Sequence, residues 1–202
     1  MHRPVLVTAP FFLPVSLEEM KQALRILERE GDGNALPHED DDLITSEIEA
    51  ATAHYEGWTG ILGICLVDQT WRQDFDGFCR GLHLPIGPVI APVSVIWRNR
   101  AGQIATVNQA EYSLEADAGG RSWLRFRDAY SLPSDLYERR SVTVEYRAGW
   151  PTVEGASTVP SDIKAAIKLR VVAAYDEAAR DGAKNLERIE RDLISKYRRF
   201  AI

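Results

Sequence analysis

The feature that most constrains the fold is a long amphipathic helical pattern that runs directly into a β-strand, between Asp41 and Trp71. Apolar residues recur here at steps of four, three, four and three, on one helical face: Ile44, Ile48, Ala51, Tyr55 and Trp58. Thr59-Gly60 breaks this periodicity, and a region typical of strands then extends from Cys65 to about Gly149. The sequence therefore predicts a helical chain that is interrupted by a β insert.

Helical patterns lie on both sides of this insert. Ser16 and Glu19 have the spacing of a capping box, which predicts a helix that begins at Ser16 and ends at the glycine-rich turn starting at Gly31. After Pro160 the apolar residues again recur at helical steps as far as Ala178. The final segment carries the pattern of a fourth helix, or of a helix followed by a tail, with these apolar positions: Leu186, Ile189, Leu193, Tyr197 and Phe200.

Between these helices, apolar and polar residues alternate between turn signals and predict six or seven strands. The candidate strands are Gln69–Phe75, Leu82–Ile86, Val93–Trp97, Ile104–Val107, Tyr112–Leu114, Trp123–Phe126 and Val142–Tyr146. We expect an α+β fold, in which a small bundle of about four helices is interrupted by an inserted antiparallel β domain, a barrel or sandwich. Residues 1–65 would form the N-terminal arm and two helices, 66–149 the β domain, and 150–202 the C-terminal helices and tail.

Composition narrows the possible functions. The 24 basic and 30 acidic residues give a net charge of −6, which disfavours tight general binding of phosphates. Cys65 and Cys79 are too few for a disulfide framework, and we expect both to be reduced. The apolar run at residues 4–15 is interrupted by Pro10 and Pro14, and nothing approaches the length of a membrane span. We expect a soluble protein that does not enter membranes.

No local motif predicts catalysis, a cofactor or a metal. The run His38–Asp42 holds many potential ligands, but adjacent side chains diverge around a helix axis, so a helix start is the favoured interpretation. Asp74 and Asp76 precede Gly77 without the rest of a calcium loop. His54 lies beside a core-facing tyrosine, where packing is favoured over acid–base chemistry. An enzyme would need a noncontiguous site, for example one that joins Asp74 or Asp76 to His83.

A binding module is the alternative of a different class. Small β-barrels often bind oligonucleotides through aromatic strand faces. The β insert carries five candidate aromatic residues, for which core packing is the favoured interpretation: Trp71, Phe75, Trp97, Trp123 and Phe126. In this alternative the insert recognises nucleic acid or a host or tail protein.

The C-terminus is basic and aromatic in a chain that is acidic as a whole. The five residues are Lys196, Tyr197, Arg198, Arg199 and Phe200. One interpretation is a cationic last turn that complements the helix dipole. The other is a docking segment in which aromatic residues anchor and arginines pair with acidic groups of a partner. The two are compatible.

Segments along nearly the whole chain, in order, resemble the head–tail connector proteins of long-tailed bacteriophages, prophages and gene transfer agents, also called adaptor or head-completion proteins. The matching segments are Pro14–Ile26, Asp40–Trp71, Leu84–Leu114, Val142–Trp150, Val159–Ala178 and Leu193–Phe200. Their ordered set, and no single segment, is specific. The loops Gly31–Glu39 and Asp128–Arg140 are longer than usual, and Lys196 stands where the family often carries proline.

The resemblance implies a structural virion protein without enzymatic activity or cofactor. It implies a ring of about a dozen subunits below the portal protein, which joins the DNA-filled head to tail-proximal neck or tail proteins while DNA passes without specific binding. The location implied is the neck of the particle, and the cytoplasm of the bacterial host before assembly. The hypothesis that follows is that the segment from Lys196 to Phe200 docks onto the portal.

Overall fold

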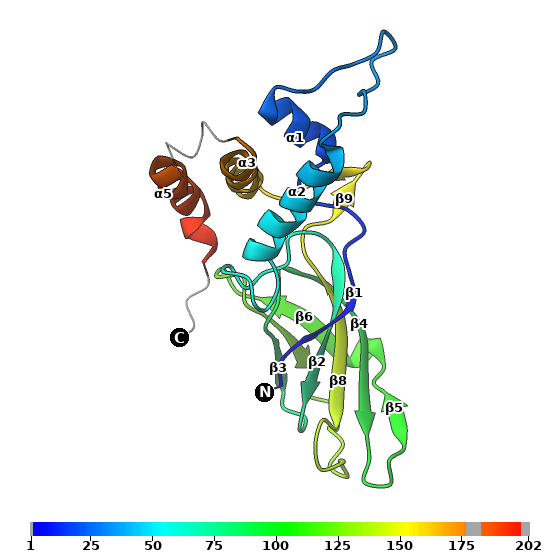
Figure 1. The fold of residues 1–202 in the computed structure, drawn as a ribbon. Coiled ribbons are helices and arrows are strands. Elements are labelled where there is room, and N and C mark those ends of the chain that lie inside the picture. Colours follow the sequence, from blue (N-terminus) through cyan, green and yellow to red (C-terminus); the bar gives the residue numbers. More distant parts are fainter. Residues whose placement is uncertain (1, 177–182, 199–202) are drawn as a thin grey trace. The chain divides into compact units, whose positions relative to one another are not determined.

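The structure is a computed structural model that describes residues 2–176 and 183–198 (Figure 1). Its contacts divide the chain into two compact units. The β unit contains Met1–Phe11 and Val67–Pro151, and the helical unit contains Phe12–Leu66 and Thr152–Ile202. The chain thus enters the helical unit, leaves it for the β unit after Leu66 and returns after Pro151.

A five-stranded antiparallel sheet dominates the β unit (Figure 1). In spatial order its strands are β1 (Val5–Thr8), β2 (Gln69–Phe75), β8 (Val142–Ala148), β4 (Val89–Arg98) and β5 (Ile104–Thr106). Alternation gives β8 one buried face, formed by Val142, Val144, Tyr146 and Ala148. Trp71 of β2 lies opposite Tyr146, in a register that pairs buried residues across the two strands.

A three-stranded antiparallel sheet completes the β unit, in the order β3 (Gly81–Leu84), β7 (Ser122–Phe126) and β6 (Tyr112–Ala116), with the short 3₁₀-helix η1 (Gln109–Glu111) before β6. Its buried residues include Leu82, Leu84 and Leu124. The ring of Phe126 contacts Phe78 and Tyr112 edge to face. The antiparallel β insert is therefore confirmed, whereas the described strands form two sheets and a closed barrel is not confirmed.

The N-terminal arm belongs to the β unit. The sequence pattern predicts that the arm belongs with the helices in residues 1–65, but β1 pairs with β2 and forms an edge of the large sheet. Two contacts hold its start: His2 Nε2 lies 2.8 Å from Asp76 Oδ1, and Gln73 Nε2 donates to the His2 carbonyl at 2.8 Å. These partners are more than 70 residues away in sequence, so local patterns do not indicate the pairing.

The helical unit contains α1 (Leu17–Leu24), α2 (Asp41–Tyr55), α3 (Ser161–Tyr175), α5 (Ala183–Ile194), the 3₁₀-helix η2 (Ser195–Tyr197) and a small hairpin of β9 (Thr152–Val153) and β10 (Ala156–Ser157). These helices confirm the predicted bundle. Helix α3 packs against α1, α2 and α5. Ile44, Ile48, Ala51 and Tyr55 of α2 are buried, as the periodicity predicts. None of the helices in the described ranges combines the length and apolar character that a bilayer crossing needs.

Two local predictions for these helices were wrong. The capping box of Ser16 and Glu19 is present, but α1 ends at Leu24 and not near Gly31. Arg25 adopts a left-handed conformation, with φ of 63°, and its N–H donates back to the Gln22 carbonyl. Trp58 was placed on the core face of α2, yet it follows the end of that helix and 43% of its surface is exposed.

We predict that Gly149→Ala destabilises the β unit by about 3 kcal/mol. Gly149 has a φ of 117°, and an added Cβ would lie 2.2 Å from the Val67 carbonyl oxygen, so strain and a backbone clash combine. The matched control is Gly102→Ala, where φ is 83° but no atom lies within 4 Å of the new Cβ. We expect a cost of about 1 kcal/mol there. Urea unfolding checks both values, and equal costs would contradict the clash.

Candidate functional site

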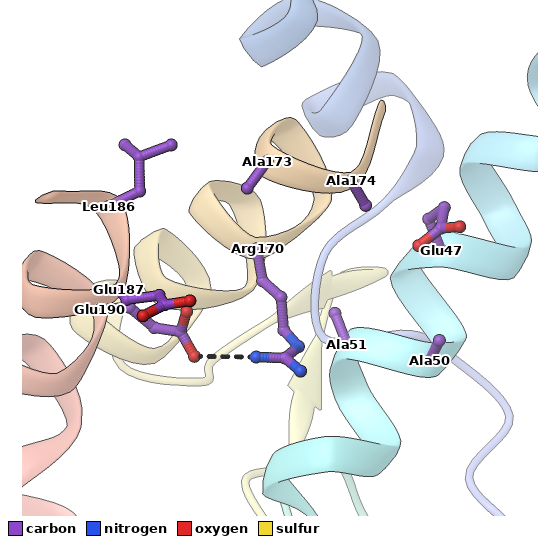
Figure 2. A pocket seen from close by; sticks show the side chains of 9 residues that line it. All are labelled: Glu47, Ala50, Ala51, Arg170, Ala173, Ala174, Leu186, Glu187 and Glu190. Atoms are coloured by element: carbon purple, nitrogen blue, oxygen red, sulfur yellow. Dashed lines mark hydrogen bonds and ion pairs between the residues drawn. The ribbon is translucent and has the colours of Figure 1, made fainter. Parts of the chain in front are cut away.

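A cavity of about 390 Å³ opens between α2, α3 and α5 (Figure 2). Small side chains leave this space: Ala50 and Ala51 on α2, and Ala173 and Ala174 on α3. The remaining lining residues are Glu47, Arg170, Leu186, Glu187 and Glu190. A neighbouring cavity of about 280 Å³ shares Arg170, Glu187 and Glu190, and adds His54, Ile61, Arg191, Ile194 and Arg198.

Glu190 lies where the three helices meet, and only 9% of its surface is exposed. The Tyr55 hydroxyl on α2 donates a hydrogen bond to Glu190 Oε1, at 2.5 Å. Arg170 on α3 reaches the same oxygen through Nη1, at 3.3 Å (Figure 2). A buried carboxylate needs such partners because desolvation otherwise disfavours its charge. Glu190 thus connects the three helices through polar contacts.

This network shifts the acidity of its neighbours. Burial, together with the hydrogen bond to Glu190 and its charge, raises the pKa of the Tyr55 phenol, which therefore stays protonated as a donor. Burial and the positive charge of Arg170 lower the pKa of His54, although Glu190 opposes this shift. The Tyr55 phenol and the Arg170–Glu190 ion pair thus connect the three helices through structural contacts. In the described part of the chain, no three His, Cys, Asp or Glu side chains gather as metal ligands.

The predicted C-terminal docking segment is partly engaged within its own chain. Lys196 forms an ion pair with Asp162 at the start of α3, and its ammonium lies 5.1 Å from the centre of the Tyr197 ring. The pair raises the pKa of Lys196. Arg198 is exposed and lines the smaller cavity. Arg199 and Phe200 lie outside the described residues, and the docking role of the segment stays a prediction.

The acidic run before α2 marks the helix start, as predicted, because α2 begins at Asp41. Asp41 accepts a hydrogen bond from the His38 N–H at 3.0 Å and forms an ion pair with Lys21 at 2.9 Å. These contacts, the first above all, lower the pKa of Asp41. Asp40 accepts a hydrogen bond from the Tyr175 hydroxyl at 2.6 Å. The run thus joins α1, α2 and α3 through specific polar contacts.

The carboxylates considered for an enzyme site have structural partners. Asp74 accepts a hydrogen bond from Thr143 Oγ1 at 2.9 Å. Asp76 accepts one from the Arg140 N–H at 2.9 Å, in addition to its contact with His2. His83 lies on β3, opposite Trp123 of β7. Both carboxylates therefore hold the β unit together.

The five candidate aromatic residues of the insert are buried or half-buried. Trp71 and Phe126 are buried, and Phe75, Trp97 and Trp123 are half-buried. The Trp123 indole donates to Glu115 at 3.0 Å. Core packing, the interpretation favoured from sequence, fits these positions.

Two charged residues, Lys21 and Glu190, are buried in the helical unit, which the sequence patterns considered above do not predict. Lys21 is 2% exposed and donates to the Leu36 carbonyl at 2.6 Å, besides its ion pair with Asp41. Lys21 stands four residues after Leu17 on the apolar stripe of α1, and Glu190 stands four residues before Ile194 on that of α5. A charged residue inside an apolar stripe is the signal that indicates such a position.

We predict that Tyr55→Phe destabilises the helical unit by about 2 kcal/mol, because Glu190 loses a buried donor. The matched control is Tyr112→Phe in the β unit. Tyr112 is 8% exposed and its hydroxyl forms no hydrogen bond with any described residue, so its loss should change stability by less than about 0.5 kcal/mol. Denaturant unfolding measures both, and equal effects would contradict the assigned role of the Glu190 contact.

We also predict that His54 makes stability depend on pH. The folded pKa of His54 lies below the unfolded value of about 6.5. Between the folded and the unfolded pKa, the unfolded chain binds more protons than the folded chain. The contribution of His54 to the free energy of unfolding is therefore fully present above about pH 7.5 and is lost as the pH falls below 6.5 toward the folded pKa. His54→Gln should flatten this part of the profile, measured as the unfolding midpoint against pH. A variant whose profile keeps the full slope would contradict the assignment.

Comparison with known proteins identifies the fold. No protein-family model matches the chain, and no curated protein sequence matches it significantly. Among solved structures, it is similar to a chain from the neck of an empty gene transfer agent particle computed with C6 symmetry, with a TM-score of 0.75 and 22% identity, covering 100% of this chain and 97% of that chain.

Two further structures agree. A chain from the virion of a native gene transfer agent particle has a TM-score of 0.72 at 23% identity, covering 98% of this chain and 96% of that chain. A chain from the neck of a native particle computed with C12 symmetry has a TM-score of 0.65 at 20% identity, covering 98% and 97%. The fold expected from the sequence resemblance is confirmed over the whole chain: it is the fold of protein chains found in gene transfer agent particles.

Proposed function

We propose that this chain is a structural component of the neck of a phage-like particle, a head–tail connector of the adaptor type. The observation that carries the proposal is the shared fold over the full length of this chain and 97% of a chain from a gene transfer agent neck. A match of this extent includes both the helical unit and the β unit. Fold alone does not determine function, but the polar residues around Glu190 and Asp41 also make contacts that join helices, as expected for a structural role.

The proposed position is a ring below the portal protein, between the DNA-filled head and tail-proximal neck or tail proteins. The related necks were computed with C6 and C12 symmetry, which supports a ring of about a dozen copies. A ring needs a head-to-tail interface that closes on itself. The net charge of −6 suits a channel wall that repels the phosphates of passing DNA.

Within this ring, the C-terminal segment from Lys196 to Phe200 is the proposed portal contact. Lys196 pairs with Asp162 at the start of the segment, and the exposed side chain of Arg198 can reach a partner. Arginine pairs well with carboxylates at interfaces, and aromatic residues provide anchors. The alternative is a β insert that recognises nucleic acid or a host or tail protein. Its nucleic acid form is the less favoured, because the five candidate aromatic residues are buried or half-buried and suit core packing better than base stacking.

The test uses light scattering of the full chain, alone and mixed with the portal protein encoded in the same genome. We predict a stoichiometric complex whose mass corresponds to a ring on the portal. A chain that ends at Arg198 should bind the portal at least about tenfold more weakly, a loss of about 1.4 kcal/mol. Its stability should not change, since the Lys196–Asp162 pair is retained.

A chain that ends at Ser195 is the matched variant, because it also loses that ion pair. It should lose portal attachment and unfold at slightly lower denaturant concentration, since an exposed pair contributes little. Full attachment of the Ser195-terminated chain would contradict the docking role. Absence of any complex between the full chain and the portal would contradict the connector function itself.

A further inference from the structure

We propose that neighbouring copies of this chain meet through oppositely charged helix faces, the basic face of α5 on one copy and the acidic face of α2 on the next. The inference deepens the proposed ring and rests on it. It names the two surfaces that form the interface between copies.

The basic face of α5 consists of Lys184, Arg188 and Arg191. Steps of four and three residues place these side chains on one side of the helix, and all three residues are exposed. No described residue forms an ion pair with any of them. Glu187 and Asp192 flank this face, so the cationic area is narrow. A narrow stripe in a chain of net charge −6 suits a matching carboxylate stripe better than a nucleic acid backbone.

The acidic face of α2 has the complementary pattern. Asp42 and Glu49 are exposed and stand seven residues apart, with the small exposed residues Ser46 and Ala53 on the same side. Neither carboxylate has an ion-pair partner among the described residues. Lys184 and Arg191 are also seven residues apart, and two helical turns correspond to about 10 Å in each helix. The charges therefore match in sign and in spacing.

The order of the helices directs these faces away from each other. Figures 1 and 2 show α3 between α2 and α5, and α3 packs against both. The buried side of α2 carries Ile44 and Ile48, and the buried side of α5 carries Glu190 and Ile194. The acidic face of α2 and the Lys184 and Arg188 side of α5 therefore lie on the outer flanks of the helical unit, whereas Arg191 also borders the smaller cavity. One copy thus offers the two different halves of a head-to-tail contact, which is the kind of interface that closes a ring.

The two helices also carry exposed aliphatic side chains. Leu43 of α2 is 50% exposed, and Ile189 of α5 is 42% exposed. The exposed residue Ala50 follows Leu43 by two turns on α2 and permits close approach of a second helix. Apolar contact supplies affinity that surface ion pairs alone do not, whereas the charges select partner and register.

The experiment reverses each face separately. The first variant carries Lys184→Glu and Arg188→Glu, and the second carries Asp42→Lys and Glu49→Lys. Arg191 stays unchanged because it lines the cavity with Glu187 and Glu190, where reversal would add intramolecular repulsion. A third variant carries all four substitutions. Assembly into rings on the portal, or at high concentration, is followed by sedimentation velocity.

Each single-face variant should assemble at least about tenfold more weakly than the wild type, because like charges then face each other. An equimolar mixture of the two should recover assembly, since both kinds of contact in an alternating ring again pair opposite charges. The third variant should assemble by itself, which also shows that the substituted chain folds.

The outcomes separate this inference from the proposed function. A wild type that forms rings while both single-face variants form them equally well would overturn the inference and leave the connector function standing. A mixture that fails to recover assembly would also overturn it. A wild type that stays monomeric at high concentration and with the portal would overturn both.

Discussion

The helical unit depends on one buried carboxylate. Glu190 of α5 is held by the Tyr55 hydroxyl of α2 and the Arg170 guanidinium of α3, beside two cavities of about 390 and 280 Å³. Apolar packing alone does not fill the space between these helices, because alanines line it. The polar contact therefore fixes where α5 lies against α3. The position of α5 in turn determines which of its faces reaches solvent and where the C-terminal segment begins.

The same constraint connects fold to assembly. In the proposed ring, each copy would need a helical unit that is rigid enough to repeat and that still offers separate surfaces to other copies and to other components. The contacts of Glu190 bury one face of α5, and Lys184 and Arg188 lie on the exposed side of the helix. The ion pair between Lys196 and Asp162 holds η2 against the start of α3. It thereby positions the first residues of the proposed portal contact.

Much of the fold was predictable because its signals are local. The periodicity of α2 identified Ile44, Ile48 and Tyr55 as core residues, and alternation identified β2 with its observed bounds, Gln69–Phe75. The features missed depend on contacts between distant residues. The N-terminal arm pairs with β2 and contacts Asp76 through His2, 74 residues away, and the role of Glu190 depends on Tyr55, 135 residues away. The end of α1 was missed because Arg25 adopts a conformation that glycine usually provides. The candidate site was predictable only as a basic C-terminal segment, since its intramolecular partner Asp162 belongs to another helix.

The proposed role of this chain is to join filled heads to tails. Electron microscopy of particles from cells in which the encoding gene is deleted tests this role most directly, with complementation by the intact gene as control. The account predicts heads and tails that remain separate, with normal tailed particles restored by complementation. Normal tailed particles without the gene would contradict it.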